Sequence, residues 1–351
     1  MKRYGNMYPK IWDMENIKLA HKNARKGKLH YQEVQMVNGN EEYYLSQIQD
    51  MLKNKTFKNS EYEIFIKKDS GKERQIYKLP YFPDRIIHHS IMQILEPLWV
   101  NTLIADTYSS LKDRGIHKGV KRIKTALKDK ENTRYCLKMD VRKFYPSINH
   151  DILKSIIRLK IKDPDVLWIL DEVIDSTDGV PIGNYLSQYF GNLYLSGLDH
   201  WIKETAECKY YFRYCDDMVI LHSDKNHLSQ LRIEISNYLE SVLNMKLKNN
   251  WQIFPVDKRG IDFLGYRFYH GHTLLRKSIA TRFKQRMKDI KENHPYLTPI
   301  NIISGVMSYY GWMKHADCYN LQTKYIDNDI INIIDDVRSQ NNTNNPLGCD
   351  K

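Results

Sequence analysis

The chain has 351 residues, 42% of them hydrophobic, and a formal net charge of +12. This length and apolar content allow two or three subdomains with a core, and the charge favours a polyanionic partner such as nucleic acid. No apolar run approaches the roughly 20 residues of a membrane span, and the start lacks the apolar segment of a signal peptide, so no membrane partner is expected. The 25 tyrosines suit stacking on bases, although many will be core and charge alone leaves a merely basic protein open.

The cysteines give no metal signal. There are five, an odd number, and no two have the spacing of a zinc site: Cys136, Cys208, Cys215, Cys318 and Cys349. Free thiols in a cytoplasmic protein are the plain expectation.

Residues 1–60 are predicted to be a basic helical extension. Its segment 16–28 is rich in Lys, Arg and His and could follow a phosphate backbone, or could simply be a solvated helix face. Glu61–Leu79 alternates apolar and polar residues around a turn at Asp69-Ser70-Gly71, which predicts a hairpin. Its basic residues near the tip could close over a triphosphate or stay exposed: Lys67, Lys68, Lys72 and Arg74.

Several helices are expected further along. Asp84 resembles an N-cap before an apolar helical face that runs to Leu98. His88 and His89 are adjacent on that helix, so they make a poor metal pair. A basic loop over 106–117, a basic helix over 119–130 and a short helix from Asn149 to Leu159 follow. One long amphipathic helix is expected after Gln188, as far as Trp201. Further helical segments are expected over 224–243 and over 276–336.

Three carboxylates follow β-prone runs. Tyr211–Leu221 predicts a hairpin with Asp216 and Asp217 at its tip, although a solvated turn is the simpler interpretation. Asp140 ends a second β-prone run. Carboxylates that converge from two strand ends suit a pair of Mg²⁺ ions, because hard divalent cations prefer oxygen ligands.

The order of these segments resembles that of reverse transcriptases, from about Glu61 to Gly265. The matching segments are the basic hairpin at 67–74, Asp84-Arg85-Ile86, Arg114–His117, Asp140–Tyr145 (motif A), Ile182–Gln188 (motif B), Tyr214–Asp217 (motif C) and Phe263–Tyr266 (primer grip). The resemblance implies an α+β fold, a right-hand polymerase with fingers, a palm of antiparallel sheet plus helices, and a helical thumb. The expected parts are the extension 1–60, fingers 61–134, palm 135–275 with part of the fingers between motifs A and B, thumb 276–338 and a disordered tail 339–351.

The resemblance also implies site residues. Asp140, Asp216 and Asp217, with Val141, would hold two Mg²⁺ ions, with Mn²⁺ as a substitute. The nucleotide site would comprise Lys68 (or Lys67), Arg74, Phe144, Tyr145, Ile182, Gly183 and Gln188, with Tyr145 as the steric gate against a ribose 2′-hydroxyl. Leu264 and Gly265 would grip the primer. The lysine usual after motif C is replaced by Trp251, with Lys248 three residues earlier, which leaves the general acid for pyrophosphate open.

Motif B points to a subtype. Ser187-Gln188 stands where group II intron and retron enzymes typically have Ser-Pro, and Ser-Gln is similar to diversity-generating retroelement enzymes, which misincorporate opposite template adenines. Apolar Ile182 stands where retroviral enzymes have Gln, and losing that hydrogen-bond partner would loosen base selection. The implied partners are template RNA, a DNA or RNA primer, dNTPs and a small basic accessory protein that forms a ring. A retron-type or antiphage-defence enzyme, or an inactive nucleic-acid-binding relative, are the alternatives.

Overall fold

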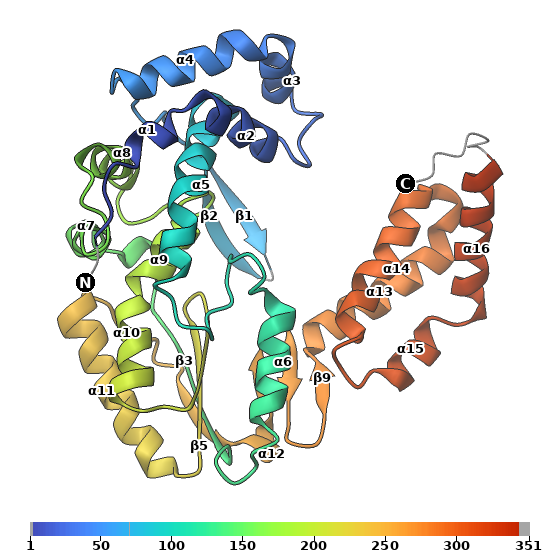
Figure 1. Cartoon of the computed structure of the whole chain (residues 1–351). Coiled ribbons are helices and arrows are strands. Elements are labelled where there is room, and N and C mark those ends of the chain that lie inside the picture. Colours follow the sequence, from blue (N-terminus) through green and yellow to red (C-terminus); the bar gives the residue numbers. More distant parts are fainter. Residues whose placement is uncertain (1–2, 70, 344–351) are drawn as a thin grey trace. The chain divides into compact units, whose positions relative to one another are not determined.

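The computed structural model describes residues 3–69 and 71–343 and divides into two compact units (Figure 1). Unit 1 comprises Met1–Gly115, Leu137–Ile220 and Asn226–Gln252. Unit 2 comprises Ile116–Cys136, Leu221–Lys225 and Ile253–Lys351. These units do not follow the boundaries expected for fingers, palm and thumb, since residues 253–275 group with the C-terminal helices; that three-part division stays a prediction.

Unit 1 is mainly helical, with a hairpin and most of a four-stranded sheet. Its helices are α1 (Tyr8–Ile11), α2 (Met14–Ala24), α3 (Gln32–Gly39), α4 (Glu41–Lys53), α5 (Ile86–Val100), α7 (His150–Arg158), α8 (Pro164–Ile174), α9 (Ser187–Tyr194), α10 (Ser196–His200) and α11 (Lys225–Leu243). Its strands are β1 (Glu63–Asp69), β2 (Lys72–Lys78), β4 (Tyr210–Tyr214) and β5 (Asp217–His222). Strands β3 (Tyr135–Asp140) and β6 (Gln252–Pro255), like β5, each have residues in both units, and the sheet order is β4-β5-β3-β6.

The core of unit 1 gathers around α5, whose apolar face is buried, as its sequence predicts. Helices α1 to α4 lie at one end of α5, and the β1–β2 hairpin lies beside it (Figure 1). The Asp13 carboxylate caps α2 by accepting from the Glu15 and Asn16 amides, which fixes the start of that helix.

Two expectations on helix boundaries need correction. Asp84 does not cap α5, because a wide turn over Tyr81–Arg85 precedes that helix and the buried Asp84 carboxylate instead accepts from the Ser60 amide and hydroxyl. The long amphipathic helix expected before Trp201 is divided into α9, α10 and a turn at Trp201–Thr205. The hydrogen bonds between Asp84 and Ser60 are tertiary contacts, and such contacts leave no periodic signal in the sequence.

Other expected elements are present. Asn149 caps α7 by accepting from the Ile152 amide, as its position predicts. The basic helix expected over 119–130 is α6 (Ile116–Ala126), which begins three residues earlier and ends four earlier. The helix expected over 224–243 is α11.

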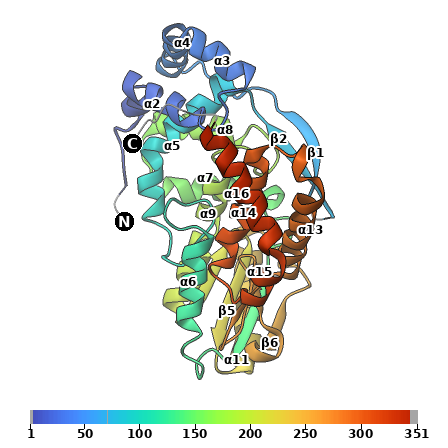
Figure 2. The same ribbon diagram turned by 90° about the vertical axis from the view of Figure 1, so that its right-hand side faces the viewer.

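Unit 2 holds a three-stranded antiparallel sheet and the C-terminal helices. The sheet comprises β7 (Ile261–Phe263), β8 (Tyr266–Phe268) and β9 (Thr273–Leu275). The helices of this unit are α6, α12 (Val256–Arg259), α13 (Lys277–Asn293), α14 (Pro299–Met313), α15 (Tyr319–Tyr325) and α16 (Asn328–Thr343). Helices α13, α14 and α16 pack side by side (Figures 1 and 2). Residues 339–343, expected to begin the disordered tail, continue α16, and 344–351 lie outside the described residues.

The α+β class expected from the sequence is confirmed. Within residues 3–69 and 71–343 no helix is both long and apolar enough to cross a membrane. Four cysteines are free thiols, as expected, at Cys136, Cys208, Cys215 and Cys318, and Cys349 lies outside the described residues.

Candidate active site

The predicted carboxylate hairpin is formed by β4 and β5, which are joined through Cys215 and Asp216. Cys215 has a positive φ of 56°, a conformation that a non-glycine residue keeps only when its surroundings hold it. The strands are largely buried, with Tyr211, Phe212 and Met218 in the core. The turn therefore presents Asp216 and Asp217 from a rigid base.

Asp140 and Asp216 converge on one ammonium group. Lys248 Nζ lies 3.6 Å from Asp140 Oδ2 and 3.5 Å from Asp216 Oδ2. The Lys248 amide also donates to the Asp140 carbonyl at 2.8 Å, which fixes this segment along the end of β3. Two carboxylates from separate strands thus share a single positive charge, as they would share a cation.

Asp217 has a different partner. Lys138 Nζ lies 3.3 Å from Asp217 Oδ2, while Asp217 Oδ1 is buried without a hydrogen-bond partner among the described residues. Among those residues no three His, Cys, Asp or Glu side chains form a ready metal-binding group. Asp140 and Asp216 therefore form a pair around Lys248, whereas Asp217 contacts Lys138.

Burial raises the pKa of Asp216, and Asp140 raises it further while Lys248 opposes the rise. Burial also raises the pKa of Asp217 to about 7, against the effect of Lys138. Each shift reflects negative charge held in a partly closed site without enough positive charge to balance it. A divalent cation would supply the missing charge, so binding one here is expected to release protons.

The donors present fit Mg²⁺ or Mn²⁺. Carboxylate oxygens of Asp140 and Asp216 face one cation already, and the orphaned Asp217 oxygen lies on the same turn. Val141 lies opposite Leu247, and the hydrogen bonds between the two segments are made by its neighbours Asp140 and Arg142. The Val141 carbonyl therefore points away from Leu247, to the other side of its strand. These residues, including the expected Val141, are chemically suited to hold the ions.

Tyr145, the expected steric gate, lies against the carboxylate turn. The Cys215 thiol donates to the Tyr145 hydroxyl at 3.3 Å, and burial raises the pKa of that phenol. A Cβ at Gly191 would stand 3.0 Å from the Phe144 ring and 3.1 Å from the Tyr145 ring, so a side chain there would press on both rings. Phe144 is buried and Tyr145 half-buried, which leaves Tyr145 as the more accessible of the two rings.

Motif B lies against the β1–β2 hairpin. The Tyr77 amide donates to the Ile182 carbonyl at 2.8 Å, and a Cβ on Gly183 would stand 2.4 Å from the Tyr77 carbonyl oxygen. Gly183 also has a φ of 120°, which strongly favours glycine. Ile182 is half-buried and Gln188 is exposed, whereas Ser187 is buried and donates to the Pro181 carbonyl.

The hairpin register separates the two candidate phosphate-binding lysines. Lys67 pairs across the strands with Arg74, whereas Lys68 pairs with Glu73 and lies 3.4 Å from its carboxylate. The register thus places Lys67 opposite Arg74 on one face of the hairpin, and Lys68 opposite Glu73 on the other face.

The expected primer grip is a tight hairpin turn in unit 2. Leu264 and Gly265 connect β7 to β8 with φ of 53° and 85°, as a two-residue turn requires. A Cβ on Gly265 would meet the Trp312 ring at 2.5 Å and Ile279 at 2.9 Å. The turn is therefore fixed against α14 and α13.

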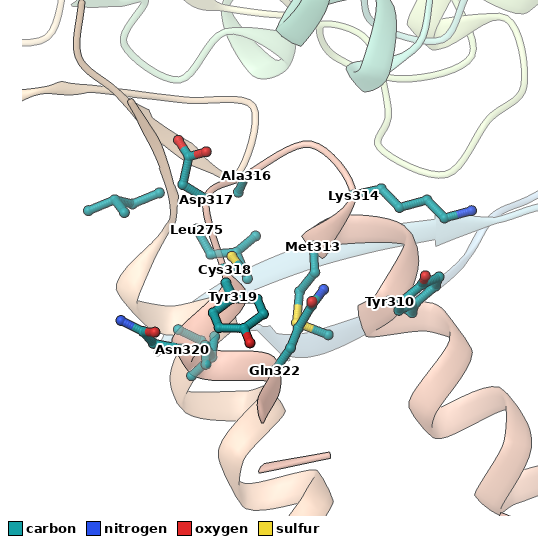
Figure 3. A pocket seen from close by; sticks show the side chains of 13 residues that line it. Leu275, Tyr310, Met313, Lys314, Ala316, Asp317, Cys318, Tyr319, Asn320 and Gln322 are labelled. Atoms are coloured by element: carbon teal, nitrogen blue, oxygen red, sulfur yellow. The ribbon is translucent and has the colours of Figure 1, made fainter. Parts of the chain in front are cut away.

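An open cavity of about 780 Å³ lies elsewhere in unit 2, bordered by β9, α14 and α15 (Figure 3). Figure 3 shows Met313, Cys318 and Tyr319 gathered in it, with Tyr310 and Lys314 to one side. The lining combines apolar and aromatic groups with the polar side chains of Lys314, Asp317, Asn320 and Gln322, and it contains none of the predicted carboxylates.

Two lysines of this site did not appear among the predicted site residues. Lys138 lies two residues before Asp140, so both face the same side of β3, and that spacing was a usable signal. Lys248 was noted only for its position near Trp251, which instead packs under the Arg232 guanidinium. Nothing in the sequence indicated that Lys248 reaches both carboxylates.

With the sheet and its carboxylates described, comparison with known proteins identifies the family of this chain. The family model "Reverse transcriptase (RNA-dependent DNA polymerase)" matches residues 66–268, more than half of the chain. The chain therefore belongs to the reverse transcriptase family.

Protein YkfC of Escherichia coli (strain K12) is 25% identical over 249 residues, covering 58% of this chain and 65% of that protein. The group II intron-encoded protein LtrA of Lactococcus lactis subsp. cremoris is 24% identical over 150 residues, 40% of this chain and 24% of LtrA. The chain thus spans less than two thirds of these relatives.

Among solved structures, telomerase from Candida albicans in complex with a fragment of telomeric RNA has a TM-score of 0.50 at 12% identity. The match covers 83% of this chain and 62% of the telomerase. This likeness concerns the fold alone, and with the family match it confirms the expected reverse transcriptase fold.

Proposed function

We propose that this protein is an RNA-directed DNA polymerase that copies a template RNA into cDNA by nucleotidyl transfer. The observation that carries the proposal is the convergence of Asp140 and Asp216 on one cationic group, within a chain of the reverse transcriptase family. Lys248 offsets only part of the cost of holding these carboxylates together, because the pKa of Asp216 is still raised, and an inactive relative would have no need to keep them so.

In this proposal Asp140 and Asp216, with the Val141 carbonyl and Asp217, would hold two Mg²⁺ ions, for which Mn²⁺ could substitute. Bound there, the ions would supply the positive charge that activates a primer 3′-hydroxyl and stabilises a leaving pyrophosphate. Lys248, which lies beside both carboxylates, would neutralise the departing phosphates. Its position makes it the candidate general acid that the sequence left open.

The incoming nucleotide would lie between motif A, motif B and the hairpin. Lys67 or Lys68 and Arg74 would neutralise the triphosphate, and the Tyr145 ring would exclude a ribose 2′-hydroxyl. The contact of Tyr145 with Cys215 supports this role, since it keeps the ring next to the carboxylate turn. Gly183 and Gln188 would border the pocket from motif B, and Leu264 and Gly265 would hold the primer.

We assign the enzyme to the diversity-generating type, which is error-prone opposite template adenine. Ile182 supports low selectivity because its side chain cannot form a hydrogen bond with the nucleotide, and its carbonyl is already bonded to the Tyr77 amide. The adenine bias itself rests on resemblance in the Ser187-Gln188 pair. Template RNA, a primer, dNTPs and a small basic accessory protein are the proposed partners.

Sequencing of cDNA made on a defined RNA template tests the proposal and its subtype. Wild-type protein should make cDNA with errors concentrated opposite adenine, and Ile182→Gln should lower them by about tenfold, which corresponds to about 1.4 kcal/mol of added discrimination. Uniformly low error at all four template bases would contradict the subtype and leave a general reverse transcriptase such as a retron-type enzyme. If the accessory protein of a neighbouring gene brings no gain in full-length cDNA, that partner is removed from the proposal.

A further inference from the structure

Arg213 is a fully buried arginine directly behind the carboxylate turn. It belongs to β4, two residues before Cys215, and none of its side chain is exposed. A buried guanidinium is costly unless its donors are paired. Its partners therefore show what the surrounding structure is arranged to hold.

One carboxylate balances its charge. Arg213 Nε and Nη2 donate to both oxygens of Asp199 at 2.6–3.0 Å, and the Tyr211 hydroxyl donates to the same carboxylate at 2.7 Å. Asp199 belongs to α10 and is also fully buried. Burial alone would lower the pKa of Arg213, but Asp199 raises it, so the group stays charged.

The remaining donors connect α9 to the turn. Arg213 Nη1 donates to Asn192 Oδ1 at 3.2 Å and to the Cys215 carbonyl at 2.9 Å, and Nη2 donates to the Asn192 carbonyl at 3.3 Å. Cys215 is the residue whose positive φ begins the turn, and Asp216 follows it. The guanidinium thus fixes the peptide bond that precedes Asp216, one of the carboxylates of the proposed metal site.

We propose that Arg213 is a positioning residue for the metal site, holding Asp216 in register with Asp140 through the Cys215 carbonyl. The inference rests on the proposed function, because it assumes that Asp216 binds a divalent ion. Stability alone does not require this arrangement, since apolar residues of similar volume often replace a buried ion pair without loss. Only a planar group with several donors reaches Asp199, Asn192 and the turn together, and a lysine ammonium does not.

Direct binding of Mn²⁺ to the purified chain, followed by the paramagnetic resonance signal of the free ion, tests this without relying on activity. Arg213→Lys keeps the charge but not the reach, and should weaken Mn²⁺ binding by roughly tenfold, as outer-shell changes do. Arg158→Lys is the matched control, because Arg158 pairs with Asp171 at 2.6 Å within the same unit, and should bind Mn²⁺ like wild type. Asp216→Asn gives the Mn²⁺ signal expected when the proposed metal site is lost.

A second variant keeps the inference testable if Arg213→Lys does not fold. Asn192→Ala leaves the pair with Asp199 intact but removes the side chain that holds Nη1 beside the turn, and should weaken Mn²⁺ binding several-fold. Wild-type affinity in folded Arg213→Lys and Asn192→Ala would overturn the inference, as would a wild-type chain that binds no more Mn²⁺ than Asp216→Asn. If wild type makes no cDNA while these variants still weaken Mn²⁺ binding, the proposed function fails and the positioning role stands.

Discussion

At the scale of single residues, Tyr145 and Phe144 are neighbours with different surroundings. The Tyr145 hydroxyl contacts the Cys215 thiol beside the carboxylates, whereas Phe144 is only 4% exposed and packs over Gly191. Both rings were candidates for the nucleotide site from the sequence. Their different exposure favours Tyr145 as the ring that meets a sugar.

Tyr145→Ala should therefore admit ribonucleotides, because the small side chain no longer excludes the 2′-hydroxyl. We expect the preference for dNTP over rNTP in single-nucleotide extension to fall by at least tenfold, about 1.4 kcal/mol. Phe144→Ala is the control, since it should cost about 3 kcal/mol of unfolding free energy and leave the sugar preference intact. An unchanged preference in Tyr145→Ala, with a loss in Phe144→Ala, would move the gate to Phe144.

His88 is a second residue with a measurable consequence. Burial lowers its pKa to about 3, helped by His89 and Arg85, and its Nε2 has no hydrogen-bond partner among the described residues. Because the folded chain keeps His88 neutral while the unfolded chain protonates it near pH 6.5, its contribution to stability is present above pH 6.5. That contribution is lost as the pH falls toward 3.

The free energy of unfolding should thus decrease on acidification below pH 6.5, with His88 contributing up to about 1.4 kcal/mol per pH unit. His88→Phe keeps a ring of similar size and cannot take up a proton, so its unfolding free energy should depend less steeply on pH. Urea unfolding at several pH values between 5 and 7.5 measures this slope. The same slope in variant and wild type would contradict the assignment.

At the scale of elements, the β1–β2 hairpin is fixed to motif B by close backbone contact. The Tyr77 amide bonds the Ile182 carbonyl, the Asn184 amide group donates to the Tyr62 hydroxyl at 3.2 Å, and Gly183 leaves no room for a Cβ. Since the hairpin carries the basic pair Lys67 and Arg74, its placement decides whether those charges can reach a bound triphosphate.

Gly183→Ala should displace the hairpin, because the new Cβ would meet the Tyr77 carbonyl and the φ of 120° disfavours alanine. We expect the KM for dNTP to rise by at least tenfold with RNA binding retained. Gly115→Ala is the matched control, since nothing lies within 4 Å of a Cβ there. Steady-state extension kinetics with normal KM in Gly183→Ala would show that the contact plays no part in nucleotide binding.

Local sequence patterns predicted helices and strands better than they predicted tertiary contacts. Alternation predicted the β1–β2 hairpin, β-prone runs predicted the β4–β5 hairpin, and Asn149 marked the start of α7, because these signals lie within a few residues. Asp84 was assigned as a cap since its spacing fits one, yet Ser60, 24 residues away, takes its hydrogen bonds. The Lys248 contacts join residues more than 30 and 100 positions apart, which no periodicity encodes.

At the scale of the whole molecule, motif order predicted the family that the match to residues 66–268 then identified. The division into two units was not predicted, since compactness depends on which long-range contacts form rather than on motif boundaries. The net charge of +12 agrees with a nucleic-acid partner but leaves its identity to the proposal.

The central claim is that the carboxylates of β3 and of the β4–β5 turn carry out DNA synthesis on RNA. Single-turnover addition of one dNTP to a primer on an RNA template, measured across Mg²⁺ concentrations, tests it most directly. Asp140→Asn and Asp216→Asn should each slow the step by at least 10³-fold, and Asp217→Asn by less because its partner is Lys138. Asp151→Asn, an exposed acid of α7, should behave like wild type. Near-normal rates in Asp140→Asn or Asp216→Asn would contradict the account.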